Sequence, residues 1–263
     1  MTTLADLPDL APIVAEHDYP VLFATVSGAH LYGFPSRDSD IDLRGVHILP
    51  VVDIVGLRAP TETIGRMWMR DGVEMDLVTH DLRKFTRLLL RPNGYVLEQL
   101  LSPLIVHTTP WHAELADLVP GMITAGHAGH YLGFAATQWR LFGKSGDLKP
   151  LLYTFRVLMS GIHLMGSHEV CAHLPTLIDR LGAPTYLRDL ITAKACAEHQ
   201  RLDQITGVPD HDRLQRDVEA LIQQLADARD RSGLPERPSV AGAVEDLVVQ
   251  ARLEDGASLG MGW

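Results

Sequence analysis

The sequence predicts an α+β fold, in which an N-terminal α/β domain is followed by an all-helical C-terminal domain. The first observation is a set of apolar runs of strand length, each bounded by turn residues, at 21–26, 40–49 and 73–79. The second is a change near Val119-Pro-Gly121, beyond which the apolar residues follow helical spacing alone. Because 263 residues suffice for two domains, we place one at 1–119 and the other at 120–263.

The first domain is expected to contain further elements around these three strands. We expect helices at 9–17, 82–91 and 95–101, and strands at 61–70, as an edge of the sheet, and at 102–106. Thr79 or Asp81 caps the second of these helices. Leu82, Phe85, Leu88 and Leu89 recur at helical spacing and form its buried side.

The second domain is expected to consist of amphipathic helices and their connections. We expect these helices at 130–140, 149–165, 183–204, 211–229 and 241–253. A glycine-containing loop over 143–147 joins the first two, and Pro235 and Pro238 break the chain before the last. The tail over 255–263 is expected to be mobile.

Composition limits the classes of function that this chain can have. The net charge of −10 excludes non-specific coating of nucleic acid, so RNA or DNA has to be bound by a local basic patch. Cys171 and Cys196 are too few for a disulfide scaffold and fit a reducing cytosol. We see neither an N-terminal signal nor an apolar run long enough to span a membrane. We therefore expect a soluble, cytoplasmic protein.

The stretch that connects the first two strands carries the chemistry. Asp40 and Asp42 are two residues apart in an extended segment, so their side chains lie on the same face. Paired carboxylates repel each other unless a cation lies between them, and Mg²⁺ is bound by one or two carboxylates together with substrate phosphates. Gly28 and Gly33 bracket the preceding turn, whose backbone N–H groups can approach an anion. The pattern favours a site for a metal-bound nucleoside triphosphate.

The strand over 73–79 has a polar face that can complete this site. Glu74 and Asp76 share that face, while Val73, Met75 and Leu77 share the other. A third carboxylate supports a two-metal site for phosphoryl transfer and can take the proton of an attacking hydroxyl.

Two motifs in this region resemble those of a known group of enzymes. The segments Ser27-Gly-Ala-His-Leu-Tyr-Gly33 and Asp38-Ser-Asp-Ile-Asp-Leu-Arg-Gly-Val46 resemble the signature of the DNA polymerase β nucleotidyltransferase superfamily. Within it, they are most similar to the YcgL-type, RNA-repair-pathway-associated nucleotidyltransferases. The chain departs from the superfamily at Gly28-Ala29, where Gly-Ser is usual, so it lacks the serine hydroxyl that helps to hold the triphosphate.

The resemblance implies an α/β nucleotidyltransferase domain with a mixed sheet and a helical domain that closes over the nucleotide. It implies transfer of a nucleoside monophosphate from a nucleoside triphosphate to a hydroxyl, with an RNA end as acceptor and with release of pyrophosphate. It assigns catalysis and the binding of two Mg²⁺ ions to Asp40, Asp42 and Asp76, with Glu74 in reserve. The implied nucleotide-binding residues are Ser27, Gly28, Ala29, Gly33, Arg44, Lys149, Tyr153 and Arg156. Family-like residues in the helical half are Tyr131, Gly133, Phe134 and Gln138.

Several alternatives remain open at this level. Arg83, Lys84 and Arg87 lie off the buried side of their helix, where they form either a basic patch for a nucleic acid backbone or a solubilising surface. The acceptor can also be a small molecule, such as an antibiotic, or a protein hydroxyl. Ala29 is also compatible with a catalytically weak, nucleotide-binding scaffold.

Overall fold

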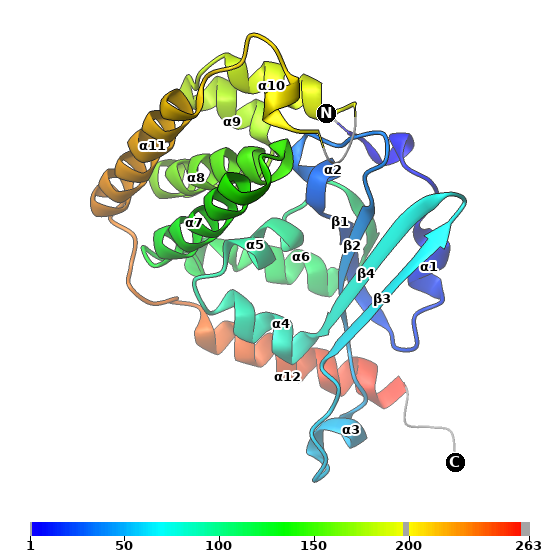
Figure 1. The fold of residues 1–263 in the computed structure, drawn as a ribbon. Coiled ribbons are helices and arrows are strands. Elements are labelled where there is room, and N and C mark those ends of the chain that lie inside the picture. The colour runs from blue at the N-terminus through cyan, green and yellow to red at the C-terminus, as the bar shows by residue number, and fades with distance from the viewer. Residues whose placement is uncertain (1, 197–199, 259–263) are drawn as a thin grey trace. The chain divides into compact units, whose positions relative to one another are not determined.

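The structure is a computed structural model that describes residues 2–196 and 200–258. It divides into two compact units (Figure 1). The first comprises residues 1–28, 40–122 and 237–263, and the second comprises 29–39 and 123–236. The chain thus changes from the sheet to the helices close to the expected boundary at 119. Residues 237–258, which we expected in the helical domain, lie in the unit that contains the sheet.

The first unit is built on one five-stranded sheet with the order β3-β4-β2-β1-β5. Its strands are β1 (Val21–Val26), β2 (Ile41–His47), β3 (Thr63–Arg70), β4 (Val73–Asp81) and β5 (Ile105–Thr108). Its helices are α1 (Ala11–Ala15), α3 (Val51–Val55), α4 (Leu82–Leu89), α5 (Gly94–Leu100), α6 (Pro110–Asp117) and α12 (Ala241–Ser258). β2 and β4 pair in parallel and the other neighbours pair antiparallel. The expected α+β class with a mixed sheet is therefore confirmed.

The two faces of this sheet differ in how they are covered. One face carries a core of apolar side chains from β1, β2 and β4, on which Leu10 and Ile13 pack from the α1 segment. The other face is covered in part by α4, α5 and α6. There Phe23 of β1 contacts Phe85 of α4 edge-on, with ring centroids 5.5 Å apart, and stacks on His112 of α6 at 4.3 Å. These helices cover β1 and leave the β3–β4 side of this face partly open.

The helix α4 follows β4 directly and begins as the sequence predicts. The Asp81 carboxylate accepts a hydrogen bond from the Arg83 backbone N–H at 3.0 Å, which caps the helix. Leu82, Phe85 and Leu89 are buried, as their helical spacing predicts, whereas Leu88 is only partly buried. In Figure 1, α12 runs along α4, and the two helices are in contact.

The second unit is organised around one helix that is buried on most sides. Its helices are α7 (His127–Ser145), α8 (Leu148–Ser167), α9 (Leu174–Leu181), α10 (Tyr186–Lys194) and α11 (His211–Arg231). α8 packs against each of the other four and is apolar around most of its circumference, which is typical of a central helix. α2 (Gly28–Tyr32) lies at the junction of the two units in the chain.

Some elements differ from the prediction. The expected loop at 143–147 is wrong in its first half, because α7 continues through Ser145 and ends at Gly146, whose φ of +71° provides the left-handed C-terminal cap. The expected helix over 183–204 is shorter, at Tyr186–Lys194, and its stretch 197–199 lies outside the described residues. Residues 255–258 of the expected tail belong to α12, and 259–263 also lie outside the described residues.

Candidate functional site

Two of the three predicted carboxylates meet on neighbouring strands. Asp42 of β2 pairs with Asp76 of β4 in the parallel register. Their side chains are 17% and 20% exposed, so both are accessible from solvent at the surface of the sheet. Strand pairing therefore brings together two acids that are 34 residues apart in the sequence.

Arg44 lies between these two carboxylates. Its Nη2 forms ion pairs with Asp42 Oδ1 and, at 2.7 Å, with Asp76 Oδ2. Its Nη1 donates to the Asp76 carbonyl oxygen at 2.6 Å, and its Nε donates to the Tyr95 hydroxyl at 3.1 Å. Burial disfavours the charged guanidinium, but the interactions with Tyr95, Asp42 and Asp76 outweigh burial and raise the pKa of Arg44. A permanent positive charge thus compensates the two carboxylates.

The turn after β1 lies directly against one of the acids. Gly28 has a φ of +60°, and a Cβ placed on it would lie 1.7 Å from Asp42 Oδ2. The Ser27 backbone N–H also donates to the Asp42 carbonyl oxygen at 2.8 Å. Only glycine combines the left-handed conformation with so close an approach. The backbone of the glycine turn and the Asp42 carboxylate therefore form one continuous surface.

The hydroxyl of Ser27 is an unexplained polar group beside this turn. The residue is fully buried, and its Oγ has no hydrogen-bond partner among the described residues. Buried hydroxyl groups are nearly always satisfied. The Ser27 hydroxyl at the end of β1 is therefore a polar group that the described residues leave unsatisfied.

The remaining acids are placed differently. Asp40 precedes β2 and is partly exposed, and Glu74 is exposed on β4. Within residues 2–196 and 200–258, no three His, Cys, Asp or Glu side chains are close enough to hold a metal ion. The donor set that the structure assembles is thus the pair Asp42 and Asp76. Two hard carboxylate oxygen donors fit Mg²⁺, which completes its shell with water and substrate phosphates.

The nucleotide-binding residues predicted in the helical half, Lys149, Tyr153 and Arg156, all lie in the second unit. Lys149 and Tyr153 of α8 line a cavity of about 490 Å³ together with Gln138 and Lys144. Arg156, one turn further, is 2% exposed, and its guanidinium carbon lies 3.8 Å above the centre of the Tyr32 ring.

Ala29 and Gly33 also belong to the second unit. Ala29 is buried. Gly33 has a φ of +83°, and a Cβ there would lie 2.4 Å from His173 Nε2. Gly33 thus allows the chain to pack closely against the start of α9.

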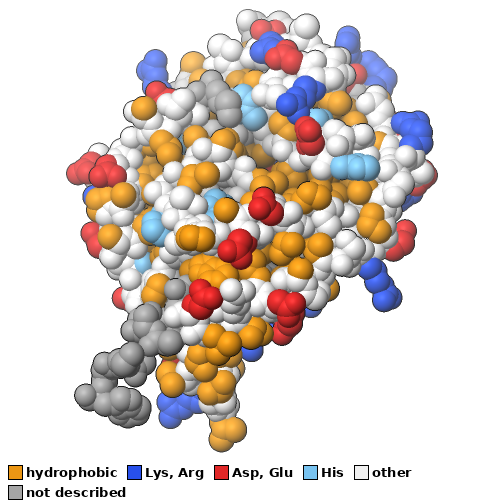
Figure 2. All heavy atoms as spheres, turned by 180° about the vertical axis from the view of Figure 1, so that it is seen from behind, with side chains coloured by type: hydrophobic (Ala, Val, Ile, Leu, Met, Phe, Trp, Pro, Cys, Tyr) orange, Lys and Arg blue, Asp and Glu red, His pale blue; other side chains and the backbone are white. Residues whose placement is uncertain are grey.

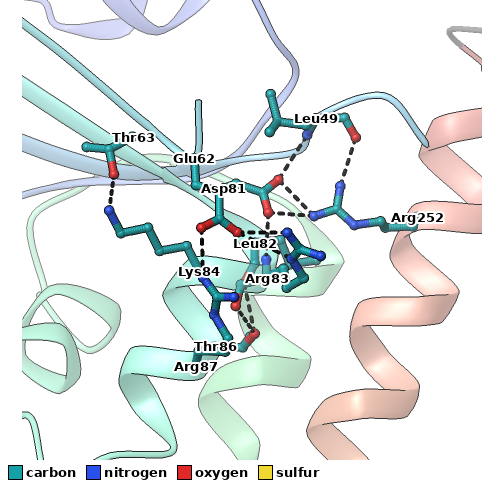
Figure 3. Close-up of polar contacts among 10 residues, drawn as sticks. All are labelled: Leu49, Glu62, Thr63, Asp81, Leu82, Arg83, Lys84, Thr86, Arg87 and Arg252. Atoms are coloured by element: carbon teal, nitrogen blue, oxygen red, sulfur yellow. Dashed lines mark hydrogen bonds and ion pairs between the residues drawn. The ribbon is translucent and has the colours of Figure 1, made fainter. Parts of the chain in front are cut away.

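The basic side chains of α4 form hydrogen bonds and ion pairs with Glu62 and Thr63, where β3 begins (Figure 3). Glu62 Oε1 accepts from Arg83 Nε and Nη2 at 3.3 and 3.1 Å, and Glu62 Oε2 accepts from Arg87 Nη2 at 2.7 Å. Lys84 Nζ donates to Thr63 Oγ1. A single carboxylate therefore orients two arginines, which sequence reasoning did not foresee because Glu62 lies outside every motif.

Sequence reasoning also missed one partner of the site and the contacts of another residue. Tyr95 contacts Arg44 from α5, 51 residues away, and no local pattern indicates this contact. Arg44 is among the predicted nucleotide-binding residues, and in the structure it bridges the two acids. Its position two residues after Asp42 on the same face was a signal for that pairing.

Comparisons with known proteins bear on this arrangement. The model of the RNA repair pathway DNA polymerase beta family matches residues 5–250. An uncharacterised protein of Methanocaldococcus jannaschii is 31% identical over 154 residues, which cover 56% of this chain and 61% of that protein. A nucleotidyltransferase-like protein of Exiguobacterium sibiricum, of known crystal structure, aligns with a TM-score of 0.31 and 9% identity over 93% of this chain and 77% of its own.

Within the described residues, no helix is long and apolar enough to cross a membrane.

One family model matches the sequence over nearly its full length. The same chain has the acid pair, the mixed sheet and the glycine turn against Asp42. The chain therefore belongs to the RNA repair pathway DNA polymerase beta family, which indicates a nucleotidyltransferase of the DNA polymerase β type.

Proposed function

We propose that this protein transfers a nucleoside monophosphate from a nucleoside triphosphate to the hydroxyl of an RNA end and releases pyrophosphate. The observation that carries the proposal is the pairing of Asp42 with Asp76 across β2 and β4, with the Gly28 backbone against Asp42. Acceptor choice is supported by the name of the family, which refers to RNA repair.

Asp42 and Asp76 are the residues that would hold Mg²⁺, with Asp40 as a further ligand from the start of β2. Bound Mg²⁺ neutralises the triphosphate and stabilises the charge that develops during phosphoryl transfer. The carboxylate of Asp76 lies at the accessible surface, where it can take the proton of the attacking hydroxyl.

The triphosphate is bound by the glycine turn in this proposal. The backbone N–H groups at Gly28 and Ala29 approach the phosphates, and the buried Ser27 hydroxyl donates to a phosphate oxygen. Ser27 then supplies a hydroxyl one residue before the glycine, in place of the serine that usually follows it. Its lack of a partner within the described residues supports this role, which requires the turn to open enough to admit a phosphate oxygen.

The family resemblance assigns further nucleotide-binding residues to the second unit. Lys149 and Tyr153 line one cavity with Lys144 and Gln138, a set that offers two ammonium groups, an amide and an aromatic ring. Arg156 and Gly33 complete the set that the family resemblance implies. Cations of this kind balance the charge that builds up on the leaving pyrophosphate.

The test is label transfer from each of the four NTPs, carrying ³²P at the α-phosphate, in the presence of Mg²⁺. Total RNA, a protein extract and a panel of small hydroxyl compounds serve as acceptors, and D42N/D76N is the control. Label that enters RNA only with the wild-type protein supports the proposal. Label in protein or small molecules alone would redirect the acceptor, and nucleotide binding without any transfer would indicate a scaffold.

A further inference from the structure

The face of the sheet that carries the acid pair continues away from it over β4 and β3. Asp76, Val78 and His80 alternate along β4 and so point to the same side. The antiparallel register places Met67 opposite Asp76, Gly65 opposite Val78 and Thr63 opposite His80. Directly paired residues of two strands share one face. A continuous surface thus leads from the carboxylates to Thr63.

This surface is open and has no bulky polar side chain in its middle. Met67 and Met69 are 66% and 63% exposed beside the acid pair. A Cβ added at Gly65 would meet only the Leu77 carbonyl oxygen, at 3.9 Å. Flexible thioether side chains adapt to flat apolar partners such as bases. The surface can therefore accommodate a single nucleic acid strand.

The far end of the surface carries an excess of positive charge. Lys84 donates to Thr63, which also bonds His80 Nδ1 at 2.9 Å, and Arg83 and Arg87 stand beside them on Glu62. Arg83 and Arg87 share the Glu62 carboxylate, and Lys84 bonds a neutral hydroxyl (Figure 3). These four side chains thus carry two net positive charges in a chain whose net charge is −10. Lys and Arg are scattered, mainly near the edges, on the face drawn in Figure 2.

The two arginines remain able to bind a further anion. Their side chains are 40% and 54% exposed. Arginine has five N–H donors in a rigid fork, and Glu62 engages only Nε and Nη2 of Arg83 and Nη2 of Arg87 among the contacts of the described residues. Glu62 fixes the direction of both guanidinium groups, which lowers the entropy lost when a phosphate binds.

We propose that this surface, which we call the acceptor track, binds the end of a single-stranded RNA acceptor. It consists of Met67, Gly65, Thr63, Lys84, Arg83 and Arg87. Asp76 and His80 are four positions apart on β4, a distance of about 13 Å, which equals about four stacked nucleotides of one strand. The reacting hydroxyl lies at the acid pair and the upstream phosphates lie at the cations. This assignment rests on the proposed nucleotidyl transfer and names the acceptor site for it.

The linear separation of acids and cations favours a polymer over a small acceptor. A compact molecule at Asp76 would not reach Arg87, whereas a nucleic acid strand carries a phosphate at every step. The RNA strand is thus held by charge at one end of the track and by apolar contact at the other.

The test is fluorescence anisotropy with a 5′-fluorescein RNA of about 12 nucleotides, with shorter RNAs as competitors. We expect affinity to rise with length up to about four nucleotides and then to level off. The variant R83Q/R87Q should bind at least about tenfold more weakly, and its slope of log K against log salt should be smaller by about 1.4, because two phosphate contacts are lost. Gly65→Phe should weaken binding without a change in slope.

The matched control is Arg66→Gln. Arg66 is exposed on β3, the strand that carries Gly65 and Met67, but its side chain lies on the face of the sheet opposite to the acceptor track. There it stacks on Trp68, with its guanidinium carbon 4.4 Å from the ring centre. Arg66→Gln removes one positive charge from β3, next to α4 in the fold but on the other face of the sheet, and should leave RNA affinity unchanged within about twofold. Thermal unfolding of each variant checks that the fold is retained.

Three results would overturn the track. The first is wild-type RNA affinity in both R83Q/R87Q and Gly65→Phe. The second is a loss of affinity in Arg66→Gln equal to that in R83Q/R87Q, and the third is binding of a multiply phosphorylated peptide as tight as that of RNA.

Label transfer separates this proposal from the proposed function. If the wild type binds RNA as described but transfers no label to any acceptor, the proposed function fails and the track stands. If R83Q/R87Q transfers label to short RNA at the wild-type rate and binds RNA as tightly as the wild type, the track fails and the proposed function stands.

Discussion

Replacing Arg252 with methionine tests whether α12 is an integral part of the sheet unit. Arg252 Nη2 contacts both oxygens of Asp81, at 2.6 and 2.8 Å, and its Nη1 donates to the Leu49 carbonyl oxygen at 2.8 Å (Figure 3). The Asp81 side chain is 1% exposed and that of Arg252 is 11% exposed. Arg252→Met keeps the apolar stem and removes the charge.

The expected cost follows from what remains around the Asp81 carboxylate. Removing one partner of a buried ion pair typically costs about 3–5 kcal/mol, because the other charge is left buried. Two backbone donors persist, Leu49 N–H at 3.1 Å and Arg83 N–H at 3.0 Å, and they favour the lower end of that range. The lost hydrogen bond to the Leu49 carbonyl adds about 1 kcal/mol. We therefore expect the free energy of unfolding of this unit to fall by about 3–4 kcal/mol.

Because two units can unfold separately, the assay has to report on the sheet. Hydrogen exchange of the β4 amides, followed by mass spectrometry across a urea series, gives that free energy directly. Arg229→Met is the control, since Arg229 pairs with Asp230 at the surface, where the two side chains are 45% and 65% exposed; its cost should stay below about 1 kcal/mol. An Arg252→Met cost of about 1 kcal/mol or less would show that α12 contributes little to the sheet unit.

Three further changes test other parts of the structure. Gly28→Ala should displace the Asp42 carboxylate and reduce label transfer far more than Gly72→Ala, a control with a φ of +82° but nothing within 4 Å of its Cβ; equal losses would mean that backbone strain alone matters. Burial, followed by the charge of His17, lowers the pKa of His47 from 6.5 to about 4. Between these values the unfolded chain binds more protons, so stability is complete above about pH 6.5 and about 3 kcal/mol is lost as the pH falls to about 4; urea unfolding of His47→Gln should show a smaller pH dependence. Leu225→Ala removes a fully buried side chain of α11 and should cost about 2–5 kcal/mol in the exchange of amides in the helical unit, and a cost near zero would contradict its packing.

The strands and the acid pair were accessible from sequence for a physical reason. Burial of one face imposes a two-residue period, so β2 and β4 could be recognised and the side on which Asp42 and Asp76 point could be inferred. The order of strands could not be inferred, because hydrogen bonds between backbones carry no residue-specific signal. That β4 lies beside β2, and that Asp42 and Asp76 fall in the same register, emerged only from the structure.

The helix α12 illustrates the same limit. Its apolar side chains at Val244, Leu247, Val248 and Ala251 are buried, and their spacing indicated a helix. An amphipathic pattern shows that a helix packs against another element, but it does not show which element. The partner of Arg252 lies 171 residues earlier, so the assignment of this helix to the last domain followed chain proximity and missed the long-range ion pair.

The charge balance at the acid pair connects its stability with its proposed chemistry. Two carboxylates at adjacent positions of paired strands repel each other, and the sheet can hold them together only with a compensating cation. Arg44 supplies that cation from the strand that carries Asp42, and it engages one oxygen of each acid. The second oxygen of Asp42 lies against the Gly28 backbone, where any side chain would collide with it. The protein thus orients the two acids with its own guanidinium, and in the proposed reaction a cation-bound triphosphate would meet carboxylates that are already positioned.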